Sequence, residues 1–117
     1  MTSLDNADLR ALGFQVDTKA LVLSRARRAL EIGCDGVISS GMEAKEIRDQ
    51  LGDRLLIVVP GIRPVANIDD QKRVVDVEEA FLGGADHIVV GRPIKEALDP
   101  KQAASDIQAR IAKLFKQ

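Results

Sequence analysis

Two short segments, each with a glycine followed closely by an arginine, are the parts of this chain best suited to chemistry. They read Pro-Gly-Ile-Arg-Pro at 60–64 and Val-Gly-Arg-Pro-Ile at 90–94. Glycine lets the backbone approach an anion closely, and the planar arginine guanidinium matches the geometry of phosphate oxygens. Backbone N–H groups at a following short helix would add donors. The repeated design predicts a phosphate site with Arg63, Gly91 and Arg92 as candidate residues.

Each arginine also has a simpler interpretation, which is an ion pair with a nearby acid such as Asp69 or Glu96. A single Gly-Arg pair is weak evidence because many turns contain one. Two such pairs at the ends of successive predicted strands favour phosphate binding, because phosphate sites in barrels of alternating strands and helices often use the loops after the last two strands.

For several other polar residues, a purely structural role explains the sequence as well as a functional role does. Lys45 and Asp49 stand at helical spacing and are expected to form an ion pair on a solvated helix face. His87 begins a predicted strand without an evident acid or nucleophile partner, which indicates a core or strand-edge histidine. Ser39 and Ser40 follow another predicted strand, where they would either line a pocket or cap the next helix.

Composition restricts the classes of protein to consider. The chain has 117 residues, the size of one domain, and its 45% hydrophobic and 30% charged residues are typical of a globular protein. A formal net charge of −1 argues against a nucleic-acid or membrane partner held by bulk charge. Apolar runs stay well short of the roughly 18 residues of a membrane span. The lone Cys34 is interpreted as a small core residue in a reducing compartment, so the expected location is the cytoplasm.

Short apolar runs alternate with longer amphipathic stretches, which predicts βα units and a parallel sheet. Strands are expected at 36–39, 55–59 and 87–90. Helices are expected at 5–12, 17–33, 42–51, 76–84 and 99–116. The continuous apolar run at 55–59 suggests a strand covered on both faces. Three strands, each followed by a helix, and a strand remnant at 1–4 make half of an eightfold barrel. The unpaired edges of a half barrel predict that the chain associates or is a piece of something longer.

Four motifs in a fixed order resemble a known family. The two Gly-Arg segments, Asp-Asp-Gln-Lys-Arg-Val at 69–74 and Gly-Ala-Asp at 84–86 are similar to the C-terminal run of bacterial orotidine 5′-monophosphate decarboxylases. The opening Thr2-Ser3-Leu4, with Asp8-Leu9 and Gly13, resembles that family's end of strand five and its next helix. The resemblance covers nearly the whole chain. It implies an α/β fold, the C-terminal half of a (β/α)8 TIM barrel, with residues 1–117 as one partial domain from the end of strand 5 through helix 8.

The resemblance also implies a role for each matching residue. Thr2 would contact the nucleotide, Arg63 would follow strand seven, and Gln71 would sit on a mobile loop between phosphate and pyrimidine. Gly91 and Arg92 would form the main phosphate clamp after strand eight. The implied ligands are orotidine and uridine 5′-monophosphates, the reaction needs no metal or organic cofactor, and family members are homodimers. Self-association of this chain is expected on that ground and from its open edges.

The chain departs from the family pattern in two places. Asp76-Val77 stands where the family commonly has Thr-Pro, and this change is expected to be neutral because aspartate caps helices well. The family's catalytic Asp-x-Lys-x-x-Asp run is absent from this sequence, so no catalytic residue is assigned and the isolated chain is predicted to be inactive. The alternatives are a stand-alone half barrel that binds phosphate or nucleotide without catalysis, and a sugar-phosphate decarboxylase of the same superfamily. The run at 69–73 argues against the latter.

Overall fold

A computed structural model describes residues 4–13, 17–62 and 75–115. Helices and strands alternate along these residues as the sequence predicts. Their bounds are α1 (Asn6–Ala11), α2 (Thr18–Glu31), β1 (Gly36–Ile38), α3 (Gly41–Leu51), β2 (Leu56–Val59), α4 (Val77–Leu82), β3 (His87–Ile88), α5 (Arg92–Lys95) and α6 (Pro100–Phe115).

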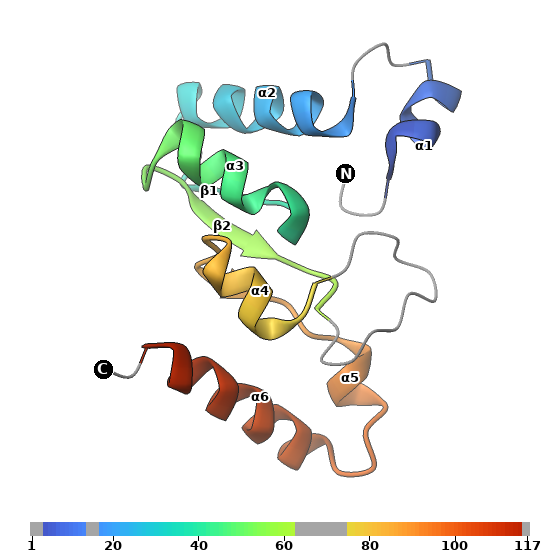
Figure 1. The fold of residues 1–117 in the computed structure, drawn as a ribbon, viewed down its shortest axis with the longest axis vertical. Helices are drawn as coiled ribbons and strands as arrows, with labels where there is room; N and C mark the ends of the chain where they lie inside the picture. Colours follow the sequence, from blue (N-terminus) through green and yellow to red (C-terminus); the bar gives the residue numbers. More distant parts are fainter. Residues whose placement is uncertain (1–3, 14–16, 63–74, 116–117) are drawn as a thin grey trace.

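The strands form one parallel sheet in the order β1-β2-β3. Val37 of β1 is in register with Ile57 of β2, and Val59 of β2 is in register with Ile88 of β3. In Figure 1, α3 and α4 lie across the side of the sheet that faces the viewer, while α2 and α6 lie toward the two ends of the long axis. The parallel βα alternation expected from the sequence is therefore confirmed.

Aspartate caps fix where several helices begin. Asp5 accepts a hydrogen bond from the Asp8 backbone N–H at 2.9 Å, and the Asp8 side chain bonds back to the Asp5 N–H, which makes a reciprocal capping box. Asp76 and Glu79 form a second box at the start of α4. Asp17 accepts from the third residue of α2, Ala20. The expected cap at Asp76 is thus confirmed.

The core lies between the sheet and the helices that cover one of its faces. Ile57 and Val59 of β2 are fully buried there, against Ile47 of α3 and against Val77 and Ala80 of α4. Side chains alternate along a strand, so the residues between them point to the opposite face.

The described residues leave much of the opposite face of the sheet exposed. Ile38 is 70% exposed, Leu56 49% and Val89 50%. The expectation that the 55–59 run is covered on both faces is therefore wrong for this chain. The described helices form a single layer. The apolar run at 55–59 is typical of a strand that is buried on both faces, but the described residues bury only one of them.

Two further expectations concern single residues. Cys34 is exposed, so its interpretation as a core residue is wrong: it directly follows the turn after α2, next to Gly33 with its φ of +96°. His87 is exposed at the start of the edge strand β3, which agrees with a strand-edge histidine. Within the described ranges, no helix has the length and apolar character needed to cross a membrane.

The Arg48 guanidinium group forms hydrogen bonds to several residues at the edge of the sheet where the strands begin. Arg48 of α3 donates to the carbonyls of Leu55 at 2.9 Å and Gly84 at 2.8 Å. It also pairs with the Asp86 carboxylate at 2.6 Å, and that carboxylate accepts the Ile57 N–H at 2.9 Å. Because charge-assisted hydrogen bonds are the stronger ones, this cluster fixes the amino ends of β2 and β3 relative to α3.

Candidate functional site

The carboxyl ends of the strands meet at one edge of the sheet because all the strands are parallel. β1 runs into residues 39–40, β2 into 60–61 and β3 into 89–91. Backbone hydrogen bonds keep neighbouring ends together: the Ser39 N–H donates to Val58 and the Val89 N–H donates to Val59. This carboxyl edge is where barrels of this architecture place their active sites.

The sequence-predicted site residues fall partly within the described chain. Thr2, Arg63 and Gln71 lie outside the described residues. The two residues that flank the segment 63–74 are described, however. Ile62, which is 1% exposed, forms an isolated parallel bridge with Val75. The segment that carries Arg63 and Gln71 therefore starts and ends beside the carboxyl edge.

Gly91 and Arg92 lie where β3 gives way to the short helix α5. The Gly91 carbonyl accepts hydrogen bonds from the Ile94 and Lys95 N–H groups at 3.0 Å each, which closes the turn. A Cβ added to Gly91 would have no atom within 4 Å, so the backbone there borders open space. Arg92 is the first residue of α5 and is half-buried. An exposed backbone glycine beside an arginine is the arrangement predicted for an anion site.

A buried polar cluster follows β1 at the same edge. Ser39 and Ser40 are each 3% exposed, and Glu43 is 2% exposed. The Ser39 hydroxyl donates to the Ser40 carbonyl at 3.0 Å, and the Ser40 hydroxyl donates to the Glu43 carboxylate. Ser40 is the N-cap residue of α3 by position, but its hydroxyl serves Glu43 rather than the helix backbone. The sequence reasoning missed Glu43, although its Ser-x-x-Glu spacing is the pattern of a capping box.

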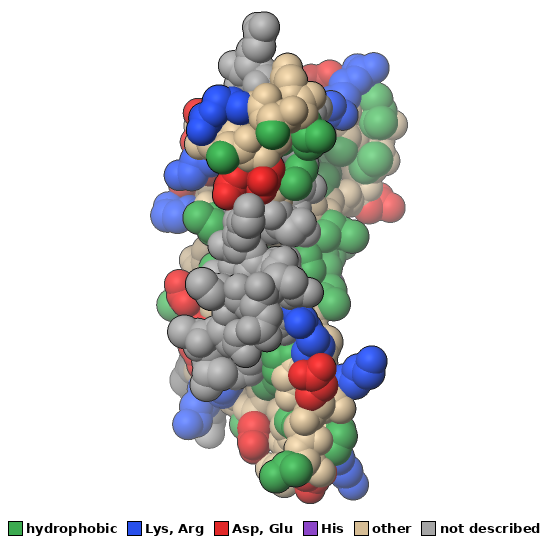
Figure 2. All heavy atoms as spheres, turned by 90° about the vertical axis from the view of Figure 1, so that its right-hand side faces the viewer, with side chains coloured by type: hydrophobic (Ala, Val, Ile, Leu, Met, Phe, Trp, Pro, Cys, Tyr) green, Lys and Arg blue, Asp and Glu red, His purple; other side chains and the backbone are tan. Residues whose placement is uncertain are grey.

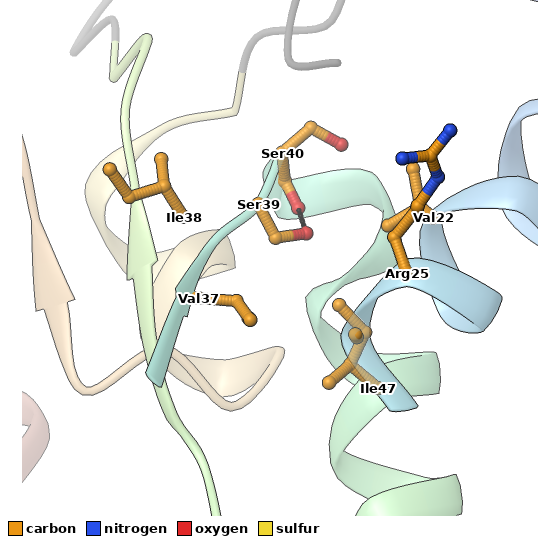
Figure 3. Close-up of a pocket in the computed structure, with 8 residues that line it drawn as sticks. Val22, Arg25, Val37, Ile38, Ser39, Ser40 and Ile47 are labelled. Carbon is orange, nitrogen blue, oxygen red and sulfur yellow. Dashed lines mark hydrogen bonds between the residues drawn. The ribbon is translucent and has the colours of Figure 1, made fainter. Parts of the chain in front are cut away.

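A cavity of about 130 Å³ lies between β1, α2 and α3 next to this cluster. Figure 3 shows Val37 and Ile47 on its apolar side, Ser39 and Ser40 at its polar end, and Arg25 reaching over it from α2. The cavity lies on the helix-covered side of the sheet. Its size suits a small, mostly apolar group with one or two hydrogen-bonding atoms.

Charged residues elsewhere in the described chain do not form a second reactive cluster. Lys45 and Asp49 make an exposed ion pair at 3.0 Å, as the helical spacing predicts. Among the residues that the structure describes, no group of three or more His, Cys, Asp and Glu side chains is placed to hold a metal ion. The chemistry that the described site offers is therefore binding by backbone, hydroxyl and guanidinium groups.

Comparison with known proteins gives a consistent picture. Residues 1–107 match the family described as Orotidine 5'-phosphate decarboxylase / HUMPS. The chain is 60% identical over 117 residues to the orotidine 5′-phosphate decarboxylase of Methylococcus capsulatus, which covers 98% of this chain and 48% of that protein. It is 49% identical over 113 residues to the enzyme of the same name from Rhodopseudomonas palustris, with 96% and 48% covered.

The solved structures agree with the sequence relatives. The structure of orotidine 5′-phosphate decarboxylase from Lactobacillus acidophilus superposes with a TM-score of 0.77 at 37% identity, over 93% of this chain and 45% of that one. Such neighbours are TIM barrels, so the described strands and helices correspond to part of a (β/α)8 barrel. The chain spans about half the length of the relatives that it matches.

Proposed function

Because the chain belongs to the orotidine 5′-phosphate decarboxylase / HUMPS family and forms about half of its barrel, we propose that it is the nucleotide-holding half of such a decarboxylase. The complete enzyme would convert orotidine 5′-monophosphate to uridine 5′-monophosphate and CO2 in pyrimidine synthesis. This half would bind the phosphate and ribose end of the nucleotide. The catalytic lysine and aspartates would come from residues outside this sequence.

The observation that carries the proposal is the pairing of two glycine-arginine segments at one sheet edge. β2 and β3 are parallel neighbours, and each runs into such a segment. Open space beside Gly91 leaves room for phosphate oxygens, with Arg92 as the neighbouring cation. Arg63 would provide a second cation, Gln71 would reach between phosphate and pyrimidine, and Thr2 would contact the nucleotide.

Binding of the phosphate by one half of the barrel and catalysis by the other is chemically reasonable. The phosphate group does not react, so its binding energy is available to order the loop around the substrate and to exclude water at the reacting carbon. Loss of CO2 leaves an electron pair on that carbon, and a lysine ammonium then protonates it. This sequence lacks the Asp-x-Lys-x-x-Asp run that supplies this lysine in the family, and the proposed reaction uses no metal or organic cofactor.

The proposal extends to assembly and location. The sheet face opposite the helices exposes Ile38 at 70%, Leu56 at 49% and Val89 at 50%. In Figure 2, hydrophobic side chains gather halfway down the right-hand outline, the side turned away from the viewer in Figure 1. A grouped apolar face of this kind supports a homo-oligomer. The near-neutral net charge of −1 gives no support to a nucleic-acid or membrane partner. A nucleotide biosynthetic role fits the cytoplasm.

Nucleotide binding tests the proposal directly. We expect the purified chain to bind uridine 5′-monophosphate in a calorimetric titration, and inorganic phosphate to compete. Arg92→Ala should weaken binding by about tenfold to a hundredfold, because a charge-assisted hydrogen bond to phosphate is lost. Lys113→Ala removes an exposed cation in the last turn of α6 and should leave the affinity unchanged. Equal affinities for the two variants would refute the phosphate role of Arg92.

A second assay tests where the catalytic group lies. The chain alone, mixed with orotidine 5′-monophosphate, should show no loss of substrate absorbance. Metal-independent turnover by the purified chain would overturn the assignment of the proton donor to residues outside this sequence, and Lys45 and Lys72 would then be the lysines to mutate.

A further inference from the structure

Gly41, the first residue of α3, lies against the side chain of Val75. A Cβ added to Gly41 would lie 2.5 Å and 2.9 Å from the two Val75 methyl groups, which is closer than real Cβ atoms approach their neighbours. The φ of Gly41 is not in the left-handed region, and alanine is more favourable than glycine inside a helix. The contact with Val75, rather than the local backbone, therefore explains why a glycine suits this position.

Buried hydrogen bonds fix the start of α3 relative to the strands. The Ser39 N–H donates to the Val58 carbonyl at 3.0 Å, and the Ser40 hydroxyl donates to the Glu43 carboxylate. The two serines and Glu43 are each no more than 3% exposed. Figure 3 shows both serines where β1 gives way to α3. Because these contacts hold α3 in place, a side chain at residue 41 would displace Val75, which is half-buried.

Val75 is joined to the part of the chain that follows β2 by its isolated parallel bridge with Ile62. Ile62 is 1% exposed and belongs to the same buried cluster as Val77, two residues beyond Val75. Arg63, which the proposed function assigns to phosphate, directly follows Ile62 in the sequence. A displacement of Val75 would therefore be passed through the bridge to Ile62, the point from which the chain continues into Arg63.

We propose that Gly41 is a positioning residue for binding of the nucleotide phosphate. The absence of a side chain at Gly41 lets Val75 pack against the start of α3, and this packing sets the Ile62–Val75 bridge next to Arg63. Gly41 acts through Val75 and Ile62 and does not itself contact the ligand. The combined size of residues 41 and 75 is then what limits phosphate binding. The inference rests on the proposed function, because its effect is measured as nucleotide affinity.

The test is a double-mutant cycle read by calorimetric titration with uridine 5′-monophosphate. Gly41→Ala should weaken binding by about fivefold or more, because the added methyl group displaces Val75. Val75→Ala removes both valine methyl groups and leaves only the Cβ of residue 75, 3.2 Å from the added Cβ. In the Val75→Ala background, Gly41→Ala should therefore change the affinity by less than about twofold.

Gly36→Ala is the matched control for a purely structural effect. It adds the same methyl group at the amino end of β1, where the Cβ would lie 2.6 Å from the Leu56 carbonyl oxygen. This variant should lose more stability than Gly41→Ala and yet bind uridine 5′-monophosphate like the unmodified chain in buffer without denaturant. Far-ultraviolet circular dichroism checks that each variant is folded. If Gly36→Ala does not fold, the double-mutant cycle still decides the question.

A second measurement needs no nucleotide. Nuclear Overhauser contacts between the backbone protons of residues 62 and 75 should weaken in Gly41→Ala and return in the double variant. Unchanged contacts in Gly41→Ala would overturn the inference, as would equal nucleotide affinities of Gly41→Ala and the unmodified chain, the same loss of affinity in both backgrounds, or an equal loss in Gly36→Ala. An unmodified chain that does not bind uridine 5′-monophosphate, with contacts that respond as expected, would instead refute the proposed function.

Discussion

The amino edge and the carboxyl edge of the sheet differ in the residues that form them. At the amino edge, Arg48 joins a strand end, a turn and Asp86 through a dense set of charge-assisted hydrogen bonds. At the carboxyl edge, small residues follow each strand: Ser39 after β1, Gly61 after β2 and Gly91 after β3. The first edge is fixed by polar contacts within the chain, while at the second the serine hydroxyls are buried and the Gly91 backbone borders open space. The amino edge therefore holds the strands in register, while the carboxyl edge is the one suited to bind a ligand.

Glycines at the two edges should differ most in their tolerance of a side chain. A Cβ at Gly36, where β1 begins, would lie 2.6 Å from the Leu56 carbonyl oxygen and 2.8 Å from its Cβ. Relief requires β1 and β2 to separate, so Gly36→Ala should lower the free energy of unfolding by about 2–4 kcal/mol. A Cβ at Gly41 would instead meet the Val75 methyl groups, the nearer at 2.5 Å. Rotation of Val75 cannot clear this contact, because its Cβ would also lie 3.2 Å away and a β-branched side chain is restricted at χ1. Relief therefore requires a shift of one loop residue, but not the separation of two paired strands, so Gly41→Ala should cost less, about 1–2 kcal/mol.

Urea unfolding of the two alanine variants measures this difference. The comparison is internally controlled because the same methyl group is added next to the same sheet. A larger loss for Gly41→Ala than for Gly36→Ala would mean that the loop base at Val75, rather than the pairing of β1 with β2, limits stability.

The Arg48 cluster should be the second largest contributor. Arg48→Ala removes donors from the Leu55 and Gly84 carbonyls and leaves Asp86 without its cation. We expect a loss of about 2–3 kcal/mol in urea unfolding, because hydrogen bonds to a charged group and a partly buried ion pair are lost together. Lys45→Ala is the matched control on the same helix. It breaks only the exposed pair with Asp49 and should change stability by less than about 0.5 kcal/mol.

Arg48 also tests whether the two edges are independent. If they are, Arg48→Ala should unfold at a lower urea concentration and yet keep its affinity for uridine 5′-monophosphate in buffer without denaturant. A drop in affinity as large as that of Arg92→Ala would show that the amino edge positions the carboxyl edge.

Local chemistry explains which features the sequence could predict. The cap at Asp76 and the helix start after Asp17 depend on contacts within three residues, and both are present. β3 is shorter than the predicted 87–90, because a strand at the edge of a sheet has one neighbour to pair with. Contacts between residues close in sequence are thus predicted well, while the extent of strand pairing is not.

Burial depends on distant partners and was predicted less well. The run at 55–59 indicates two covered faces, but the described helices cover only one of them. Cys34 directly follows the turn after α2 and is exposed, although the strand that begins two residues later is partly buried. Glu43 is buried by its bond with Ser40, although a carboxylate is usually exposed. The roles of Thr2, Arg63 and Gln71 stay predictions.

The smallest expected effect concerns a contact at neither edge of the sheet. Arg110 of α6 donates to the Glu78 carboxylate of α4, and this hydrogen bond lowers the pKa of Glu78 below its ordinary value of 4.5. A lowered pKa means that the pair stabilises the folded chain above the unfolded pKa, and that this contribution is lost as the pH falls through the folded value. Because both side chains are about one-third exposed, the contribution should stay below about 1 kcal/mol.

Glu78→Gln measures that contribution against pH. The variant should be slightly less stable than the unmodified chain at pH 7, and this difference in stability should disappear as the pH falls through the lowered pKa of Glu78. Both proteins keep the edge-to-face contact of Phe81 with Phe115 between the same helices, so α6 should stay docked. A difference in stability that does not change with pH would show that Glu78 acts through packing. A difference as large as that of Arg48→Ala would place the main polar contact of the fold between the helices instead of at the amino edge.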